Sequence, residues 1–534
     1  MIPSFTAAQI EQAEKDLMET VPEGSLMALA SHAAANLILR ELRARRGKAA
    51  GAKVLALVGP GNNGGDTLYA GAKLCLRGVA VTAVATANRM HPAGQAAFEA
   101  VGGRVVSLAE PGPGPHMPIE DVTAMALRAD CIVDGLLGIG ARGPLSGRAA
   151  GLVTTLIVEM GLDAPLRYRR PGRPFVVAID LPSGVSVDDG MVDGQVLPAD
   201  VTVTFGAYKP AALLPPASSM FGRVELIDIG LTEPLARAEA KATARRFEAS
   251  DVLATWPVPR RSDHKYTRGV VGMVAGSDTY PGAAVLTTSA AVCAGVGMVR
   301  YLGPDKAIER VLSRRPEVVP GGGRVDAWAL GPGVAPGAES QLGRIASALE
   351  WAKAKRVPAV VDAGGFALLP PSPERLDPWI ILTPHAGEMA SLLQDRGVST
   401  DRESVEAQPA HHARLAAELV GGTILLKGPA TVVSGQDGSC FVQADGPPWL
   451  ATAGTGDVLT GLIGALLAGH GDSVAITPDL PTHIAALGAL VHGRAALKAS
   501  TGSVDPGSGR LGKPIAAMDV VRALPQTIQE LLQQ

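Results

Sequence analysis

The most constraining feature of the sequence is a strand, a glycine-rich loop and a helix in direct succession, in "KVLALVGPGNNGGDTLYAGAKL" at residues 53–74. The run Val54–Val58 is apolar without polar alternation, which predicts a strand buried on both faces. Three glycines then follow with the spacing G-x-G-x-x-G, at Gly59, Gly61 and Gly64. This layout is typical of a loop that leads into a helix and holds a dinucleotide. The chain therefore starts an α/β fold rather than an all-helical or all-strand one.

The same alternation continues through the first half. Strands are predicted at 53–58, 79–85, 131–136, 175–180, 201–205 and 224–229, and helices at 6–21, 24–42, 66–77 and 149–161. Thr6 and Gln9 have the spacing of a capping box. Apolar strands that alternate with helices predict a parallel sheet covered on both faces. We expect a Rossmann-like three-layer sandwich over residues 1–230.

The pattern restarts after a charged, alanine-rich segment at 232–250, which is predicted to be a connecting helix and linker. Strands are then predicted at 270–275, 325–330, 357–362, 379–383, 423–426 and 430–434, and helices at 283–297, 340–354, 410–420, 456–468 and 482–498. A chain of 534 residues is too long for one ordinary domain. We expect a linker at 231–262 and a second α/β domain at 263–534, with cores filled by Ala, Val and Leu because aromatic residues are only 4%.

Several classes of protein are disfavoured. The net charge of −3 gives no electrostatic argument for nucleic acid or an anionic membrane. The first residues include acids and no long apolar core, unlike a signal peptide. The most apolar window, "GLIGALLAGH", is too short to span a bilayer. The four cysteines are scattered singly, so neither a zinc ribbon nor a disulfide framework is indicated. We expect a cytoplasmic protein that binds neither nucleic acid nor membrane.

Three loops of the first half follow strands, at the sheet edge where open parallel sheets bind ligands. They are "GPGNNGGD", "DGLLGIGARGPLSG" and "VVAIDLPSG". The second repeats the G-x-G-x-x-G spacing, and the third puts Asp180 at a strand end and Ser183 in the turn. The segment "VTAVATANRM" lacks the acid that holds a ribose in ordinary NAD dehydrogenases, so that class is disfavoured. Alternatively, the glycines only form turns, and Asp134 and Asp180 only cap helices.

Four segments carry the chemistry of the second half: "VAGSDTYPGAAVL", "LTPHAGE", "ILLKGPATVV" and "ATAGTGDVLTG". In the last, glycines at a helix start expose backbone amides to an anion, and the helix dipole adds to the attraction. A bound phosphate would repel Asp457 unless that acid takes a proton from a hydroxyl as phosphate arrives. Alternatively, Gly454–Asp457 is only a helix cap, His385 is structural, and Lys427 is an ordinary charge at a strand end. No Walker A sequence is present.

The motifs "NNGGD", "DGLLGIGARGP", "AIDLPSG" and "TFGAYKP" resemble the N-terminal domain of the bifunctional NAD(P)H-hydrate repair enzymes. This resemblance implies an epimerase for hydrated NAD(P)H (NAD(P)HX) with a bound potassium ion. Residues implied to hold the hydrate are Asn62, Asn63, Gly64, Gly65, Asp66, Gly138, Ile139, Gly140, Ala141, Arg142, Gly143, Pro144 and Asp180. Asp180 is also the candidate base. Potassium ligands are implied at Asn63, Asp134 and Ser183.

The motifs "ALGPGV", "TPHAGE", "KGPAT" and "GTGD" occur in this order along the chain and resemble a ribokinase-like fold. Their combination resembles the ADP-dependent NAD(P)HX dehydratase over residues 245–520. Implied contacts to the hydrate are Ala283, Gly333, His385 and Asp457, with Asp457 as catalytic base. Implied contacts to ADP or AMP are Lys427, Gly428, Pro429, Ala430, Thr431 and Gly456, with Mg²⁺ on the nucleotide. Two positions depart from the family. Ala386 replaces a proline, and "DAGGFALL" after Asp362 lacks a second acid.

The resemblance implies one isomerase and one lyase activity in metabolite repair. The substrates would be NADHX, NADPHX and ADP. The first half would interconvert the R and S hydrates, and the second would dehydrate the S form to NAD(P)H, releasing AMP and phosphate. We also expect a homo-oligomer, for which a tetramer is one candidate. Two alternatives remain: a ribokinase-like kinase of a small alcohol, and a non-enzymatic scaffold like those of mRNA decapping, which share the N-terminal fold.

Overall fold

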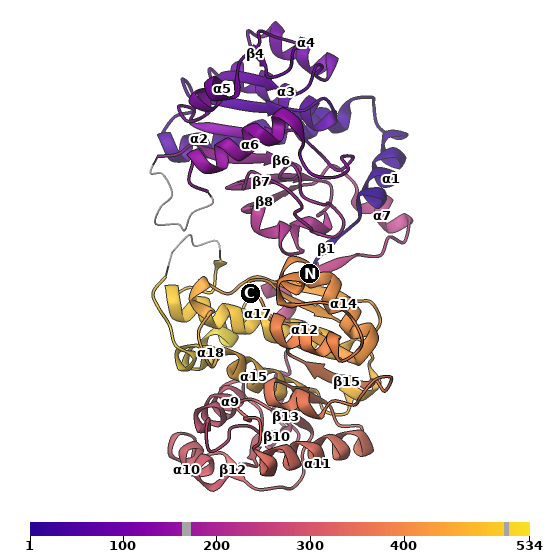
Figure 1. Cartoon of the computed structure of the whole chain (residues 1–534), viewed down its shortest axis with the longest axis vertical. Helices are drawn as coiled ribbons and strands as arrows, with labels where there is room; N and C mark the ends of the chain where they lie inside the picture. The colour runs from indigo at the N-terminus through magenta and orange to yellow at the C-terminus, as the bar shows by residue number, and fades with distance from the viewer. Residues whose placement is uncertain (163–171, 507–511) are drawn as a thin grey trace. The chain divides into compact units, whose positions relative to one another are not determined.

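The computed structural model describes residues 1–162, 172–506 and 512–534. The chain divides into two compact units (Figure 1). The N-terminal unit comprises residues 3–243, and the C-terminal unit comprises residues 244–534 together with residues 1–2. Each unit is built around its own sheet.

The sheet of the N-terminal unit has the order β4-β3-β2-β5-β6-β7-β8, and all of its pairs are parallel. Its strands are β2 (Lys53–Val58), β3 (Ala80–Ala85), β4 (Arg104–Ser107), β5 (Cys131–Gly135), β6 (Phe175–Ile179), β7 (Val201–Phe205) and β8 (Arg223–Ile227). The predicted parallel sheet is therefore confirmed. Strand order reverses between β2 and β5, and ligands of open α/β sheets bind at such a switch point.

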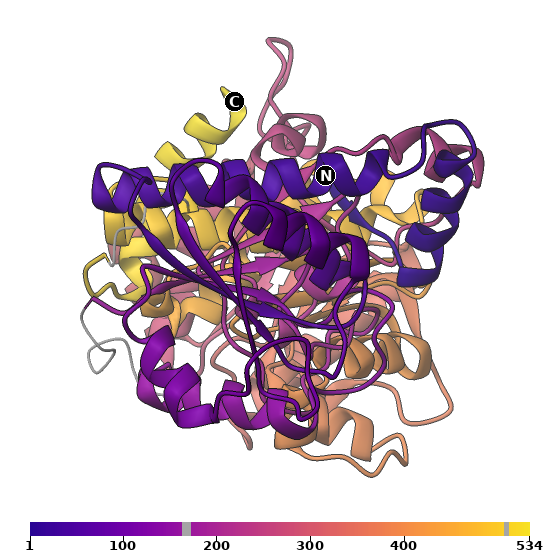
Figure 2. The ribbon, with the colours of Figure 1, turned by 90° about the horizontal axis from the view of Figure 1, so that it is seen from above.

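Helices cover both faces of this sheet, as the view in Figure 2 shows for the indigo and purple ribbon. Val54 and Ala56 of β2 pack in one core with α1 to α4, whereas Leu55 and Leu57 pack in a second core with α5 and α6. The helices are α1 (Ala7–Met18), α2 (Ser25–Arg46), α3 (Asn62–Cys75), α4 (Pro92–Ala100), α5 (Ile119–Ala126) and α6 (Gly147–Glu159). Alternation of side chains along one strand thus fills two cores. The predicted capping box of Thr6 and Gln9 is present at the start of α1.

The sheet of the C-terminal unit has the order β1-β9-β18-β17-β16-β15-β14-β13-β10-β11-β12. The strands are β1 (Ile2–Ser4), β9 (Ala244–Arg246), β10 (Val270–Val274), β11 (Met298–Tyr301), β12 (Val319–Pro320), β13 (Ala327–Leu330), β14 (Ala359–Val361), β15 (Leu376–Leu382), β16 (Gly421–Leu426), β17 (Thr431–Ser434) and β18 (Cys440–Gln443). Strands β10 to β16 pair in parallel, whereas β17 pairs antiparallel with both β16 and β18.

Helices pack against this sheet, and the most buried of them are rich in Ala and Gly. The helices of the unit are α8 (Ala249–Thr255), α9 (Pro281–Cys293), α10 (Asp305–Arg314), α11 (Glu339–Lys355), α12 (Ala386–Gln394), α13 (Arg402–Ala407), α14 (Pro409–Val420), α15 (Thr455–His470), α16 (Ser473–Ile476), α17 (Leu480–Thr501) and α18 (Ala517–Leu532). Helix α15 is apolar around its circumference and is buried along most of its length. It lies very close to α9, since a Cβ on Gly461 would be 2.2 Å from the carbonyl oxygen of Thr287.

The single connecting helix predicted at 232–250 is wrong. The structure has α7 (Thr232–Arg237), then the strand β9, and then the start of α8. Strand β9 pairs in parallel with β18, with Arg245 opposite Phe441. Helix propensity of the alanine-rich segment is overridden here by burial of Ala244 and Phe247, which anchor the strand.

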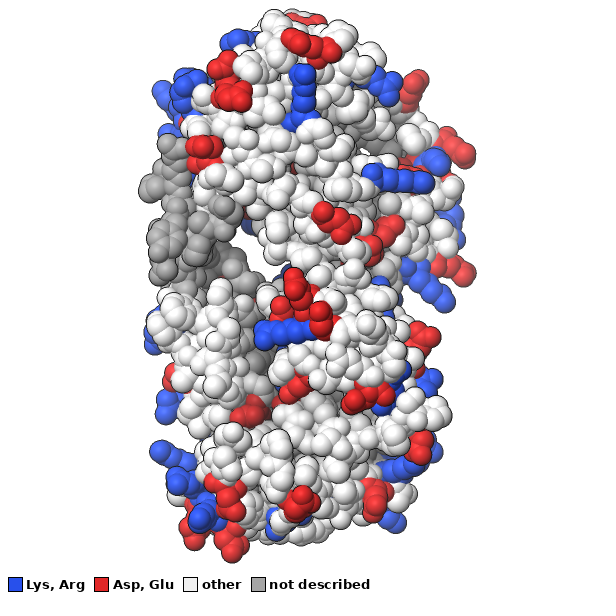
Figure 3. All heavy atoms as spheres, viewed as in Figure 1, with Lys and Arg blue, Asp and Glu red and all other residues white. Residues whose placement is uncertain are grey.

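On the face drawn in Figure 3, acidic and basic side chains lie interspersed rather than gathered by sign. Within the described residues, no helix combines the length and the apolar character that a bilayer-spanning segment requires.

Candidate functional site

The loop between β2 and α3 is held by two of its three glycines. A Cβ on Gly59 would lie 1.8 Å from the carbonyl oxygen of Leu136, and one on Gly64 would lie 2.0 Å from that of Gly59. Gly61, in contrast, has open space around it and precedes α3 without a side-chain cap. Gly59 and Gly64 therefore serve backbone packing, while Gly61 leaves the first amides of α3 open to an anion.

The three predicted cation ligands come together at the ends of β5 and β6 and the start of α3. Ser183 donates from its hydroxyl to Asp134 Oδ1 at 2.6 Å and from its backbone nitrogen to Oδ2 at 2.8 Å. The Asn63 amide donates to the carbonyl oxygen of Leu137 at 2.7 Å, and Ser183 Oγ lies 3.4 Å from that same oxygen.

Asp134 is buried and forms no ion pair with any described residue. Burial raises its pKa, and the hydrogen bonds from Ser183 and Leu136 oppose that rise. A buried carboxylate next to hydroxyl, amide and carbonyl oxygens provides the hard donors that potassium prefers. The residues present therefore fit the ion, although no cluster of three or more His, Cys, Asp or Glu side chains occurs in the described part of the chain.

Asp180 lies just after β6 in the left-handed backbone region, with φ at 68°. Such a conformation is strained in a non-glycine residue and is common at functional sites. Its Oδ1 accepts from the ammonium of Lys209 at 2.5 Å, and the same ammonium donates to Thr204 Oγ1 at 3.1 Å and to the carbonyl oxygen of Phe205 at 2.9 Å. The Oδ2 atom of Asp180 accepts no hydrogen bond from the described residues, so one oxygen is anchored and the other is available.

Lys209 was not identified from the sequence as a functional residue. It is only 1% exposed, and all three of its protons have an acceptor. The only sequence signal was its place in "TFGAYKP", where a lysine resembles an ordinary surface charge. A buried lysine is rare unless it is paired, and here its partner is the Asp180 carboxylate.

Two further carboxyl groups lie near this pair. Asp66 in the second turn of α3 has a buried Oδ1 without a hydrogen-bond partner. Burial raises its pKa well above the usual value, and the negative charges of Asp180 and Glu14 add to the rise. Burial also raises the pKa of Glu14 on α1, while the charge of Lys209 opposes the increase. Both groups therefore hold a proton more strongly than an ordinary exposed carboxyl group does.

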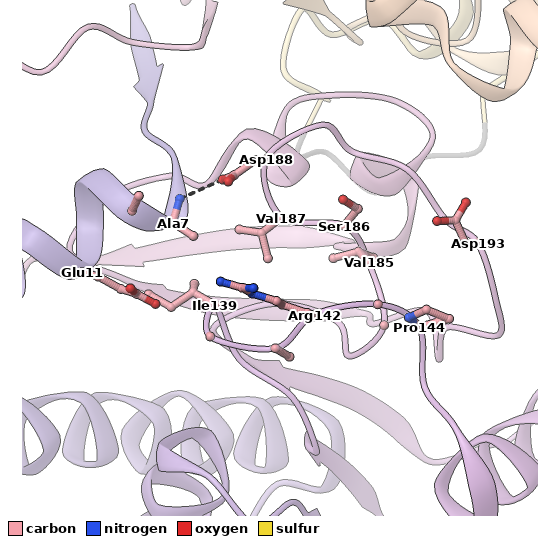
Figure 4. Close-up of a pocket in the computed structure, with 15 residues that line it drawn as sticks. Ala7, Glu11, Ile139, Arg142, Pro144, Val185, Ser186, Val187, Asp188 and Asp193 are labelled. Carbon is pink, nitrogen blue, oxygen red and sulfur yellow. Dashed lines mark hydrogen bonds between the residues drawn. The ribbon is translucent and has the colours of Figure 1, made fainter.

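A pocket of about 500 Å³ opens beside these loops (Figure 4). The predicted residues Ile139 to Pro144 line it, and in Figure 4 the Arg142 side chain points toward the side where Glu11 lies. The remaining lining residues are Ala7, Ala8, Glu11, Gly184, Val185, Ser186, Val187, Asp188 and Asp193. Residues 62–66, Gly138 and Asp180 are not part of this lining. The contribution of α1, fixed by a 2.7 Å bond from the Ala7 nitrogen to Asp188, was missed because nothing local in the sequence indicates it.

The C-terminal unit brings its predicted nucleotide residues together at the start of α15. Gly454 precedes the helix with φ at 88°, and Asp457 lies in the first turn. Lys427 lies in the turn between β16 and β17, and a Cβ on Gly456 would be 3.5 Å from its Nζ. Burial is the main cause that raises the pKa of Asp457 to about 6. The charge of Asp362 adds to this rise, and that of Lys427 opposes it.

The predicted hydrate residues of this unit lie at the same edge of the sheet. His385 caps α12, and its backbone pairs with that of Lys427 in an isolated bridge. Gly333 lies against Ala283, since a Cβ on Gly333 would be 2.3 Å from the Ala283 Cβ. Ala386 occupies the first position of α12, where proline is also well suited, so this departure from the family leaves the helix start intact.

Two family models match the chain. One, described as NAD(P)H-hydrate dehydratase, matches residues 271–505, and the other, described as the YjeF-related protein N-terminus, matches residues 23–211.

Relatives match over most of their length. The bifunctional NAD(P)H-hydrate repair enzyme Nnr of Mycobacterium leprae is 39% identical over 515 residues, which cover 95% of each chain. That of Mycobacterium tuberculosis is 41% identical over 473 residues, which cover 87% of this chain and 89% of the relative. A crystal structure of the ADP/ATP-dependent NAD(P)H-hydrate dehydratase from Bacillus subtilis with ATP and Mg²⁺ is 27% identical, with a TM-score of 0.44. The match covers 54% of this chain and 98% of that one.

Proposed function

The chain belongs to the family of bifunctional NAD(P)H-hydrate repair enzymes, and from this premise we propose how its two units divide the repair. The N-terminal unit interconverts the R and S forms of NADHX and NADPHX. The C-terminal unit dehydrates the S form at the expense of ADP. The two family models support this division, because each falls within one structural unit.

In the N-terminal unit, epimerisation requires bonds at the hydroxyl-bearing carbon to break and form again. Asp180 is proposed as the base, supported by its free Oδ2 and by the anchoring of Oδ1 on Lys209. The loop Gly138–Pro144 and residues Asn62–Asp66 are proposed to hold the hydrate. Asn63, Asp134 and Ser183 would hold potassium, whose positive charge would fix the three loops that carry them.

In the C-terminal unit, Asp457 is proposed to take the proton from the hydroxyl of the hydrate as that oxygen accepts a phosphoryl group. Lys427 to Thr431, with Gly456, would hold the nucleotide, and Ala283, Gly333 and His385 would contact the hydrate. Phosphate is a good leaving group, so its elimination restores NAD(P)H, and AMP and phosphate are released. Mg²⁺ would arrive on the nucleotide phosphates and neutralise their charge.

The observation that carries the dehydratase proposal is the meeting of Lys427, Gly456 and Asp457 at one helix start, with a base whose pKa is about 6. Purified protein with S-NADHX, ADP and Mg²⁺ should form NADH, followed by near-UV absorbance. Without ADP no NADH should form. Absence of NADH in the complete mixture would contradict the proposal. Phosphorylation of a small alcohol by ATP in the same preparation would favour the kinase alternative.

We further propose that the enzyme works in the cytoplasm. All four cysteines are free, as expected in a reducing compartment. The homo-oligomer stays a prediction that sedimentation of the purified protein would check.

A further inference from the structure

Asp362, at the end of β14, is a buried acid to which the proposed reaction gives no role. Its exposure is 2%. Its Oδ1 accepts from Lys427 Nζ at 2.7 Å, and its Oδ2 accepts from Thr460 Oγ1 at 3.1 Å. One carboxylate therefore joins the end of a central strand, the turn that carries the nucleotide lysine, and the second turn of α15.

These contacts fix where the ammonium of Lys427 lies. A lysine side chain has a flexible stem of four carbons, so an unrestrained ammonium samples many positions. Here Asp362 holds it from one side, and Glu388 Oε2 lies 3.9 Å from Nζ. A Cβ on Gly456 would be 3.5 Å from Nζ and 3.9 Å from Asp362 Oδ2, so the pair lies beside the amides at the start of α15.

Asp362 also contributes to the electrostatic environment of Asp457. Among the described residues, the charges that act on Asp457 are those of Asp362 and Lys427. Glu388 acts on Lys427, which it helps to keep charged. His492 of α17 hydrogen-bonds with the backbone of Thr455, and burial lowers its pKa to about 4, so it is neutral near pH 7.

The local backbone explains why the segment that starts at Asp362 carries no second acid. The second acid of the family segment would fall at Gly364, where a Cβ would lie 2.2 Å from the carbonyl oxygen of Val334. No side chain fits there without movement of the backbone. Asp362 is therefore the one acid that this segment carries in the chain.

We propose that Asp362 is a positioning residue for dehydration: it fixes Lys427 Nζ beside the start of α15 and places a second negative charge next to Asp457. This inference rests on the proposed dehydratase function. The nucleotide phosphate then meets an ammonium that is already oriented, and Asp457 keeps enough proton affinity to accept the hydroxyl proton.

Asp362→Asn tests both consequences with S-NADHX, ADP and Mg²⁺. The amide keeps the shape but loses the charge, so the KM for ADP should rise about tenfold. With one negative charge fewer, Asp457 loses its proton at lower pH. The acidic limb of the kcat/KM profile for S-NADHX should therefore move down by roughly 1 pH unit. Asp395→Asn, at an exposed acid of the same unit, should change neither quantity.

Thr460→Val provides a second measurement should Asp362→Asn fail to fold. It removes one hydrogen bond to Asp362 and keeps the charge, so the KM for ADP should rise about fivefold while the pH limb stays in place. An unchanged KM for ADP in Thr460→Val, or an unmoved pH limb in folded Asp362→Asn, would overturn the inference. If wild type itself forms no NADH, the proposed function fails instead.

Discussion

Asp180 and Asp457 are both carboxylates at the end of a strand or the start of a helix, but their surroundings differ. Asp180 has a buried lysine on one oxygen, whereas Asp457 is desolvated beside a second acid. The first arrangement anchors one carboxylate oxygen, and the second raises the pKa of the carboxyl group. The same side-chain type thus has a different electrostatic environment in each unit, which is consistent with the different proton transfers proposed for the two residues.

For Asp457→Asn we expect a folded protein whose dehydration rate falls by ~10²–10⁴-fold, since a positioned base contributes that much. In wild type, kcat/KM should decline as the pH falls through about 6, because the base becomes protonated. Steady-state rates from pH 5 to pH 8 check both points. A variant within threefold of wild type would leave Asp457 as a helix cap, whose loss would appear in thermal unfolding instead.

For Lys209→Met we expect a loss of about 3–5 kcal/mol in the free energy of unfolding, because Asp180 is left charged and unpaired in a buried place. The double variant Asp180→Asn/Lys209→Met should recover most of that loss and still lack epimerase activity. Urea unfolding with both variants measures the difference. A single variant as stable as wild type would show that the pair is solvated.

The residues of a candidate site were predictable where they belong to a contiguous motif. They were not predictable where their role depends on contacts between residues far apart in the sequence. The resemblance of three contiguous motifs to the family implied one site for Asn63, Asp134 and Ser183, and the structure brings these residues together. Lys209 and Glu14 were missed because their role depends on packing against Asp180 across intervening elements. Local pattern carries no information about such burial.

At the scale of elements, the strand–loop–helix units were predictable because glycines and apolar runs are local signals. Strands β2, β5, β6, β7, β10 and β17 lie within two residues of their predicted ends. Short strands such as β9, β11 and β18 were missed, since their existence depends on a partner rather than on their own three or four residues. The helix predicted over 232–250 was wrong for the same reason, because β9 forms there by pairing with β18.

Two glycines of α15, Gly456 and Gly461, allow nucleotide binding at the helix start to be tested separately from helix packing. Gly456→Ala should fold normally, because its Cβ meets only ordinary contacts, yet the methyl group would occupy space at the helix start and raise the KM for ADP about tenfold. Gly461→Ala should destabilise the C-terminal unit by about 1–3 kcal/mol, because its Cβ would clash with the backbone of α9. Thermal unfolding and ADP titration of both variants separate the two effects. The same outcome for both would contradict the assignment.

In the molecule as a whole, the two units have separate sheets and cores. A substitution in the site of one unit should therefore leave the activity of the other unit unchanged. Asp180→Ala, or removal of potassium, should abolish use of R-NADHX and leave dehydration of S-NADHX intact. Freshly isolated R epimer with ADP is needed, since the hydrates also interconvert spontaneously. Wild type should clear both epimers, whereas the variant should stall on R.

If Asp180→Ala clears fresh R-NADHX as fast as wild type, the first unit is not the epimerase, and the scaffold alternative gains support. The two-unit α/β architecture itself was predictable, because the strand–helix pattern visibly restarts. The assignment of residues 1–2 to the C-terminal unit was not, since it depends on a strand far along the chain.

That assignment has a consequence for how the protein is made. Strand β1 leaves the ribosome well before its neighbour β9, which follows more than two hundred residues later. At typical bacterial or eukaryotic translation speeds, the delay is roughly 10–50 s. During that interval the N-terminal unit can fold completely, with its chain entering and leaving at one place, where the Thr243 nitrogen bonds the Ser4 carbonyl oxygen at 2.9 Å. The nascent chain thus carries an unpaired strand edge only three residues long, which is too short to recruit many wrong partners before its own arrives.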